Sequence, residues 1–273
     1  MTVTTFDRRL VIAAAALLAA YVALAYGLAS FAWRHYEHQK GLAALGARTF
    51  TAQGIPGDAI NIGLEGTEAD VDCAMTAARW SPSDPVTLAS SLRIVDSVVF
   101  HRPYHRAPVS PLYFEGRRQD LAFEKPSGRS ASTRHHVRLW KALAAGDDGR
   151  PVWLGAATFD DGVGVSHYTG LITHHTAPDI DTERDYLMAN LVDAKRVAET
   201  YSISGVGPTL FGRNGGGSPF FTDGDIAFAR LAGCEAREGA PEGAAPPARI
   251  VAKNVLFSWL AALWRRLPAA FTR

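Results

Sequence analysis

The chain has 273 residues, of which 47% are hydrophobic, with 28 basic and 27 acidic side chains and a net charge of +1. This balance gives no bulk attraction to nucleic acid, so we expect no nucleic-acid partner. The length allows one membrane element and one folded domain of roughly 180 residues. Cys73 and Cys234 could form a disulfide, although two buried thiols are the default expectation.

The N-terminal region contains a long apolar run from Leu10 to Trp33, with no charge between Arg9 and Arg34. It exceeds the ~20 residues that a helix needs to cross hydrocarbon, so we predict a transmembrane anchor over 10–33 after a short flank, 1–9. The alternative is a cleaved signal peptide, with a cleavage site near Ala23–Ala25. We expect a single-pass protein of the cell membrane, with its main domain on the non-cytoplasmic side.

A connector is predicted over 34–54, followed by the main domain over 55–233. The alternation of Ile60, Ile62 and Leu64 predicts a strand over Asp58–Gly66. Thr67 and Asp70 then resemble a capping box at the start of a helix. These signals place the first folded elements directly after the connector.

A second helix is predicted after Asp84, which can cap it, with Pro85 in the first turn. Its apolar residues fall on one stripe, made by Leu88, Leu92, Val95 and Val99.

From Pro111 onward, the hydrophobic pattern has a shorter period, which is typical of strands. The predicted strands are Leu112–Glu115, Leu121–Glu124, His135–Lys141, Val152–Phe159 and Val165–His174. A helix is predicted from Asp181 and a late strand over Asp225–Leu231. Helices before and after consecutive strands indicate an α+β fold with a mainly antiparallel sheet and packed helices.

The C-terminal region divides into two predicted parts. Residues 234–248 resemble a linker because they are rich in Ala, Gly, Pro and charge. Residues 249–273 resemble a basic amphipathic helix. That helix could lie at a membrane interface or pack on the domain or on another subunit.

Histidine pairs mark the candidate site. In a strand, Ile172 and His174 share one face, and His175 lies on the other, so at most one of the two histidines points into a single site. In the upstream strand, Arg134, His136, Arg138 and Trp140 share a face, which makes His136 a candidate for an exposed polar site. His135 lies on the opposite face, so we expect it to be satisfied and partly buried.

The segment Thr173–Asp185 follows with several carboxylates. We consider acid, base or other catalytic roles for His136, His174 and Asp181. Together with Asp179, these residues could also bind a divalent metal ion that activates water. The alternative is structural, with Asp179 or Asp181 capping the following helix.

Arginines suggest a second kind of site, because guanidinium groups bind phosphate or carboxylate bidentately. The candidate ligand-binding residues are Arg117, Arg134, Arg138 and Arg184. The alternative is salt bridging to carboxylates such as Asp120, Glu124, Asp160 or Asp161. The glycine-rich segment Phe211–Pro219 lacks the Lys and Ser/Thr of a nucleotide-binding loop, so we interpret it as a specialised turn that could also approach a ligand.

Several separated motifs resemble the LssY C-terminal domain family: Gly54–Asn61, Ser81–Arg93, Arg102–Tyr104, Gly116–Phe123, Arg134–Trp140, Gly155–Asp160, Thr173–Asp185 and Gly212–Gly217. The resemblance covers roughly Ile55–Leu231 and implies work near a bilayer, because family members include membrane proteins with lipid-phosphatase-like or transport-like segments. Two functions remain open. One is a membrane-anchored accessory or ligand-binding domain near the bacterial envelope, with an anionic small molecule or another membrane protein as partner. The other is a metal-dependent hydrolase of a phosphate-containing envelope or lipid-related substrate.

Overall fold

The computed structural model describes residues 8–28, 39, 41–100, 102, 104–128, 131–170, 172–203, 211–236, 239, 241–243, 252, 255 and 259. The chain forms two compact units, residues 38–244 and a unit made of 1–37 with 245–273. The predicted tail helix over 249–273 therefore lies outside the described residues, apart from three single positions.

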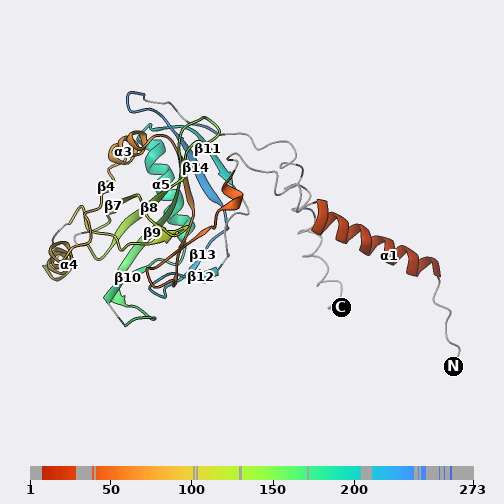
Figure 1. Cartoon of the computed structure of the whole chain (residues 1–273), viewed down its shortest axis with the longest axis horizontal. Helices are drawn as coiled ribbons and strands as arrows, with labels where there is room; N and C mark the ends of the chain where they lie inside the picture. Colours follow the sequence, from red (N-terminus) through yellow and green to blue (C-terminus); the bar gives the residue numbers. More distant parts are fainter. Residues whose placement is uncertain are drawn as a thin grey trace. The chain divides into compact units, whose positions relative to one another are not determined.

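The N-terminal helix is apolar, and none of its described residues is buried. It consists of α1 (Arg8–Val22) followed by a π-helical segment, η1 (Ala23–Leu28) (Figure 1). Arg8–Leu28 is long and apolar enough to cross a membrane, and none of its most apolar window is buried. This agrees with a single-pass anchor, and a signal sequence has the same properties. The last residues of the predicted anchor, 29–33, are outside the described part.

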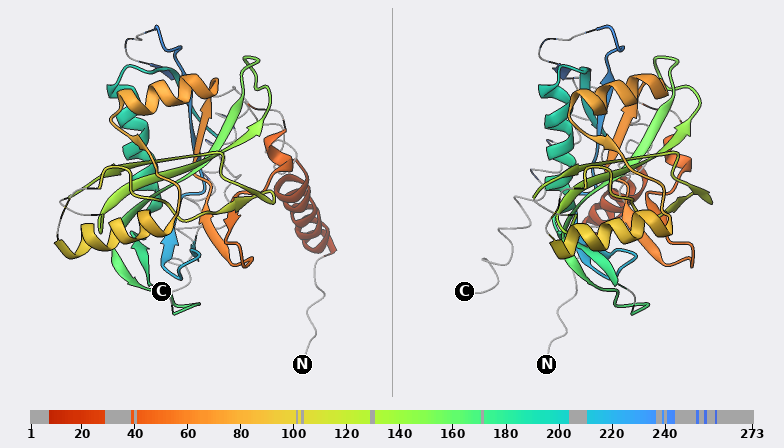
Figure 2. Two further views of the ribbon diagram at one scale, coloured as in Figure 1. Left: turned by 60° about the vertical axis from the view of Figure 1, so that its left-hand side comes forward. Right: turned by 90° about the vertical axis from the view of Figure 1, so that its left-hand side faces the viewer.

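The unit of residues 38–244 contains the α+β fold (Figures 1 and 2). Its elements are η2 (Leu42–Ala44), β1 (Arg48–Phe50), β2 (Pro56–Ala59), β3 (Ile62–Glu65), α3 (Glu68–Ala77), β4 (Ser81–Pro82), α4 (Leu88–Phe100), β5 (Tyr113–Phe114), β6 (Arg117–Arg118), β7 (Leu121–Pro126), β8 (Arg134–Leu143), β9 (Val152–Val165), β10 (Ile172–Thr176), α5 (Ile180–Asp193), β11 (Val197–Ile203), β12 (Phe211–Arg213), β13 (Pro219–Phe221), β14 (Ile226–Leu231) and β15 (Glu242–Gly243).

The large sheet has the strand order β15-β11-β14-β3-β9-β8-β7-β4, and β10 pairs with β9. The run from β7 to β10 is an antiparallel meander, and most of the other pairings are also antiparallel. β3 is parallel to β14, and β15 is parallel to β11. The predicted α+β fold with a mainly antiparallel sheet is therefore confirmed.

Apolar residues cover both faces of this sheet. On one face, α3 and α5 contribute Val71 and Leu187 to a core that also contains Val137 and Leu139 of β8. On the other face, Trp140 packs in a second core with side chains that include Leu112, Phe114 and Phe228. β8 therefore alternates between two cores, as its sequence predicts.

A smaller sheet, in the order β2-β1-β5-β6, contributes Phe114 to the second core. Its first strand, β1, falls in the segment predicted as a connector. Gln39 and Thr49 are fully buried, so the fold begins earlier than the sequence predicted. Gln39 donates a hydrogen bond to the hydroxyl of Tyr201 at 2.7 Å, a contact between distant residues that no local pattern reveals.

Several predicted boundaries need correction. The predicted strand Asp58–Gly66 is divided between β2 and β3, which belong to different sheets. The predicted strand Val165–His174 is interrupted by a turn before Gly170, whose φ of 69° favours glycine. β11 was not predicted, although Val197, Tyr201 and Ile203 show the buried alternation of a strand.

The helix caps are partly as predicted. Thr67 and Asp70 form the predicted capping box of α3. At α4, Thr87 rather than Asp84 exchanges hydrogen bonds with Ser90 of the first turn. Asp84 instead accepts hydrogen bonds from Tyr104 and Arg106, because these side chains lie beside it.

The two cysteines form a disulfide. Cys73 of α3 and Cys234, after β14, have Cα atoms 5.6 Å apart. The default expectation of two buried thiols was therefore wrong. The disulfide joins residues separated by 161 positions. Only the tertiary fold brings residues so distant in sequence together.

Candidate functional site

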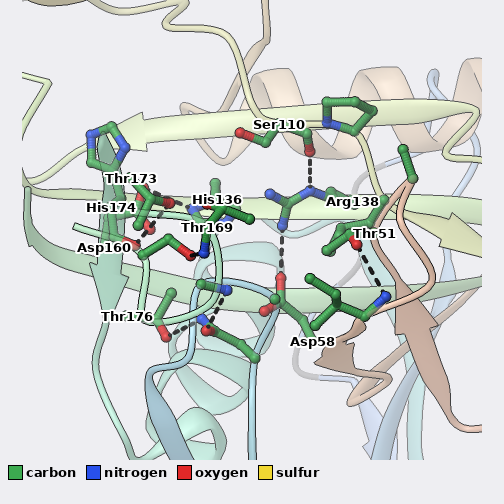
Figure 3. A pocket seen from close by; sticks show the side chains of 18 of the residues that line it. Thr51, Asp58, Ser110, His136, Arg138, Asp160, Thr169, Thr173, His174 and Thr176 are labelled. Atoms are coloured by element: carbon green, nitrogen blue, oxygen red, sulfur yellow. Dashed lines mark hydrogen bonds and ion pairs between the residues drawn. The ribbon is translucent and has the colours of Figure 1, made fainter. Parts of the chain in front are cut away.

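A polar cavity of about 330 Å³ lies on the face of the large sheet opposite α3 and α5 (Figure 3). Side chains from β8, β9 and β10 form part of its wall. Its remaining walls come from the turn at 51–55, Asp58 of β2, the segment 110–112, the turn at 166–169 and the glycine-rich loop at 214–216. Segments from the whole length of the domain therefore line the cavity.

β8 supplies the central part of the cavity. Arg134, His136 and Arg138 alternate along this strand, face the same side and all line the cavity. Their shared face was predicted. His136 is only 3% exposed, however, so the expectation that it belongs to an exposed site was wrong in that respect.

Each of the two arginines is held by one carboxylate and one backbone carbonyl. Arg134 donates from Nε to Asp160 at 2.9 Å and from Nη1 to the carbonyl of Pro108 at 3.1 Å. Arg138 donates from Nη1 to Asp58 at 2.9 Å and from Nε to the carbonyl of Ser110 at 2.9 Å. These bonds fix both guanidinium groups and do not use Nη2 of either one.

The charges in the cavity are balanced. Asp58 and Asp160 each neutralise one arginine, and all four side chains line the cavity. Burial lowers the pKa of Arg138, and Asp58 opposes that shift. The predicted alternative of salt bridges across the sheet is thus confirmed for Arg134 and Asp160.

Asp160 is the main charge partner of two cavity residues. Burial alone would raise its pKa, but the nearby His136, Arg134 and His174 outweigh this effect and lower it. The carboxylate Oδ2 lies 3.4 Å from Nδ1 of His136. Among the described residues, Nδ1 of His136 has no hydrogen-bond partner of good geometry.

The opposite nitrogen of His136, Nε2, lies 2.8 Å from the hydroxyl of Thr158. An Asp–His–Thr sequence of contacts resembles the layout of a nucleophile with its base. Thr158, however, is only 3% exposed and is not among the residues that line the cavity. The arrangement therefore orients His136 and does not present a hydroxyl to a ligand.

His174 and His175 lie on opposite faces of β10, as predicted. His174 lines the cavity, and its Nε2 is 3.0 Å from the carbonyl of Ala131. Burial lowers its pKa, so the imidazole is neutral at neutral pH. His175 packs beside His167 instead, with ring centres 6.1 Å apart. On the other face of β8, His135 contacts Glu183 at 2.7 Å, which confirms that it is satisfied and partly buried.

The glycine-rich loop approaches the cavity directly. Oδ1 of Asn214 accepts hydrogen bonds from the backbone N–H groups of Gly216 and Ser218, at 3.0 and 2.9 Å. Gly215 packs so closely on Thr51 that an added Cβ would lie 2.5 Å from its methyl group. The loop is a specialised turn, as predicted, and it brings Gly215 and Gly216 into the cavity wall.

Four other predicted site residues lie outside the cavity wall. Asp179 caps α5 by accepting hydrogen bonds from the N–H groups of residues 181 and 182. Asp181 accepts from the hydroxyl of Thr222 at 2.7 Å and from the N–H of Asp223 at 2.6 Å. Arg184 binds both oxygens of Asp223, at 2.7 and 3.1 Å. These contacts hold the loop before β14 against the start of α5.

Arg117 is the fourth of these residues. Its side chain is 55% exposed and bonds to Asp120 and to the carbonyl of Lys141. The predicted four-arginine anion pocket is thus reduced to Arg134 and Arg138.

The predicted metal ligands are also divided between two places. His136 and His174 line the cavity, whereas Asp179 and Asp181 organise the start of α5. Within the described residues, no group of three or more His, Cys, Asp and Glu side chains is placed to hold a metal ion. The physical reason is that backbone N–H groups and Arg184 already occupy the α5 carboxylates.

The comparisons with known proteins identify the family. Residues 38–226 match the family model described as "LssY C-terminus". Neither the search of curated proteins nor the search of solved structures found a match. The matched region includes the strands and the loop that form the cavity, and it covers more than half of the chain. The chain therefore belongs to the LssY C-terminal domain family.

Proposed function

We propose that this protein is a membrane-attached binding domain whose cavity holds a small polar ligand with an anionic group, a carboxylate or a phosphate ester. The observation that carries the proposal is the pair Arg134 and Arg138. Both guanidinium groups line one cavity, are fixed by carboxylates and carbonyls, and keep Nη2 out of those bonds. Fixed donors lose little entropy when a ligand binds, so they suit recognition.

The balanced charges restrict the ligand. Asp58 and Asp160 offset the two arginines, and burial favours the neutral form of His174. A multiply charged anion would meet no net positive charge, and desolvating it would be costly. The cavity therefore fits a ligand with one negative charge, or a zwitterion whose cationic group faces a carboxylate.

The membrane attachment and its sidedness rest on two further observations. Arg8–Leu28 has the length and composition of a membrane-spanning helix. The Cys73–Cys234 disulfide supports a location of the domain in an oxidising compartment, which for an envelope protein is the non-cytoplasmic side.

A metal-dependent hydrolase has less support. Its four candidate ligands are divided between the cavity and α5, and the hydroxyl of Thr158 is outside the cavity wall. Metal analysis of the purified protein tests this alternative directly, because a hydrolase of this type would hold near-stoichiometric metal.

The binding proposal is tested by calorimetry and thermal unfolding of the full chain in detergent. The probes are glycerol 3-phosphate, the zwitterion glycerophosphoethanolamine, acetate and, as a neutral control, glycerol. We expect the zwitterion to bind and to raise the unfolding temperature. The Arg138→Lys variant keeps the charge opposite Asp58 but loses the free Nη2 donor. It should weaken binding about 10- to 100-fold, because a charge-assisted hydrogen bond contributes about 1.5–3 kcal/mol.

A matched pair of glycine variants separates cavity binding from folding. Gly216 lines the cavity, and an added Cβ would meet Thr173 only at 3.4 Å. Gly162 has open space around it and is not part of the cavity wall. Gly216→Val should abolish binding, whereas Gly162→Val should not change it. Equal binding by both variants, or equal binding of glycerol and glycerophosphoethanolamine, would contradict the proposal.

A further inference from the structure

Helix α4 carries its apolar stripe on the outside of the domain. Leu88 is 79% exposed, Leu92 60%, Val95 58% and Val99 59%. The buried residues of the helix are instead Ser90 and Ser97. A surface helix of a globular protein normally turns its apolar stripe toward the core, so α4 has the reverse orientation.

Hydrogen bonds of the two serines fix this orientation. Ser97 donates from Oγ to the carbonyl of Arg102 at 2.6 Å and accepts from the N–H of Ala131 at 2.8 Å. Ser90 donates from Oγ to the carbonyl of Pro85 at 2.8 Å. Because a buried hydroxyl without a partner is costly, rotating the helix to bury its apolar stripe would break these bonds.

Exposed apolar side chains also lie on the β9–β10 hairpin. The hairpin lies beside α4 in both views of Figure 2. Ala131 lies between them, since its N–H bonds to Ser97 of α4 and its carbonyl contacts His174 of β10. Large exposed apolar side chains of the hairpin are Val163, Val165, Tyr168 and Ile172. Ile172 also lines the ligand cavity, so the cavity and the apolar surface meet at this residue.

Arginines border the stripe of α4. The side chains of Arg93, Arg102 and Arg106 are 71, 69 and 58% exposed. They pair with Asp84 and Asp96, which leaves one positive charge in excess. The guanidinium of Arg102 lies over the ring of Phe100, 5.3 Å from its centre. An apolar helix face with aromatic and basic borders fits the interface of a bilayer that contains anionic lipids.

The covalent connection keeps a bilayer within reach. The candidate span ends at Leu28, and Gln39 is already buried in the domain. A fully extended chain covers at most ~3.6 Å per residue, so Leu28 and Gln39 can be separated by at most about 40 Å. We infer that the apolar face of α4, with the β9–β10 hairpin, lies on the surface of the bilayer to which the chain is attached. The inference rests on the proposed membrane attachment.

The test uses the full chain in nanodiscs that contain phosphatidylglycerol and phosphatidylcholine. The native cysteines are bonded to each other, so a new cysteine can be labelled alone with an environment-sensitive fluorophore. The label goes at Leu92→Cys and, as the matched control, at Asp193→Cys, an exposed position at the end of α5. We expect a blue shift and quenching by spin-labelled lipids at position 92 and neither effect at position 193.

A Val95→Asp substitution added to the Leu92→Cys protein should reverse most of the blue shift, and replacing phosphatidylglycerol should weaken it. Water-like emission and no quenching at position 92 in protein that remains in the discs would overturn the inference while membrane attachment stands. A blue shift that requires two copies per disc, without lipid quenching, would overturn it in favour of contact between copies. Failure of the chain to incorporate into discs would instead overturn the attachment itself.

Discussion

Glu124 is a buried carboxyl on β7, directly across from His136 on β8. It is only 1% exposed, and among the described residues its Oε1 has no hydrogen-bond partner. Burial raises its pKa from 4.5 to about 7. The folded protein therefore binds this proton more tightly than the unfolded chain does, and folding stability falls as the pH rises from about 4.5 to about 7.

The Glu124→Gln variant should remove this dependence. The free energy of unfolding of the variant, minus that of the wild type, should be up to about 3 kcal/mol higher at about pH 8 than at about pH 5. The reason is that each unit of pKa difference between the folded and unfolded states corresponds to about 1.4 kcal/mol. Urea unfolding at the two pH values measures the effect. A stability difference that does not change with pH would show that this carboxyl does not titrate in the folded state.

Asp181 distinguishes a structural role from a catalytic or metal-binding one. Asp181→Asn weakens the contacts to Thr222, Asp223 and Arg184. We expect a loss of about 1–3 kcal/mol of stability with no change in metal content or in ligand affinity. Asp185→Asn is the control, because the Asp185 side chain is 67% exposed. Loss of a bound metal or ligand from folded Asp181→Asn protein would argue for a direct role of Asp181.

At the scale of elements, alternation along single strands predicted much of the site. The residues Arg134, His136 and Arg138 were expected on one face, and the separation of His174 from His175 was also predicted. Such periodicity involves only neighbouring residues, so it can be recognised in a single sequence. Asp58, the partner of Arg138, could not be found in this way, because β2 reaches the cavity from a different sheet.

The sequence predicted less well the orientation and contacts of elements that pack against residues distant in sequence. The apolar stripe of α4 is visible in the sequence, but its outward orientation depends on the bond between Ser97 and Ala131. The carboxylates at the start of α5 resemble metal ligands in sequence, yet Asp179 caps its own helix and a loop about forty residues away satisfies Asp181. Only the packed fold distinguishes a capped helix from a metal site.

The disulfide connects α3 to the segment after β14. Closing a loop of this length in the unfolded chain corresponds to about 5 kcal/mol in the chain-entropy account. The Cys73→Ser, Cys234→Ser double variant should lose stability of that order under oxidising conditions. Its unfolding midpoint should not respond to dithiothreitol, whereas the wild-type midpoint should fall. A wild-type midpoint that is insensitive to the reductant would contradict a structural disulfide.

At the scale of the whole molecule, the chain combines a candidate membrane span with an α+β domain that carries a cavity lined by charged and polar side chains. Segments near residues 51, 110, 134, 172 and 214 meet at this cavity. Because the cavity depends on so many distant segments, ligand binding should stabilise the domain as a unit. A ligand at about 100 times its dissociation constant would add about 2.7 kcal/mol.

The most direct test of the binding proposal is a crystal structure of the full chain with glycerophosphoethanolamine. We predict density for the ligand in the cavity, with a phosphate oxygen within hydrogen-bond distance of Nη2 of Arg134 or Arg138 and the ammonium group facing Asp58 or Asp160. An empty cavity at saturating ligand, or a ligand bound away from both arginines, would contradict the account.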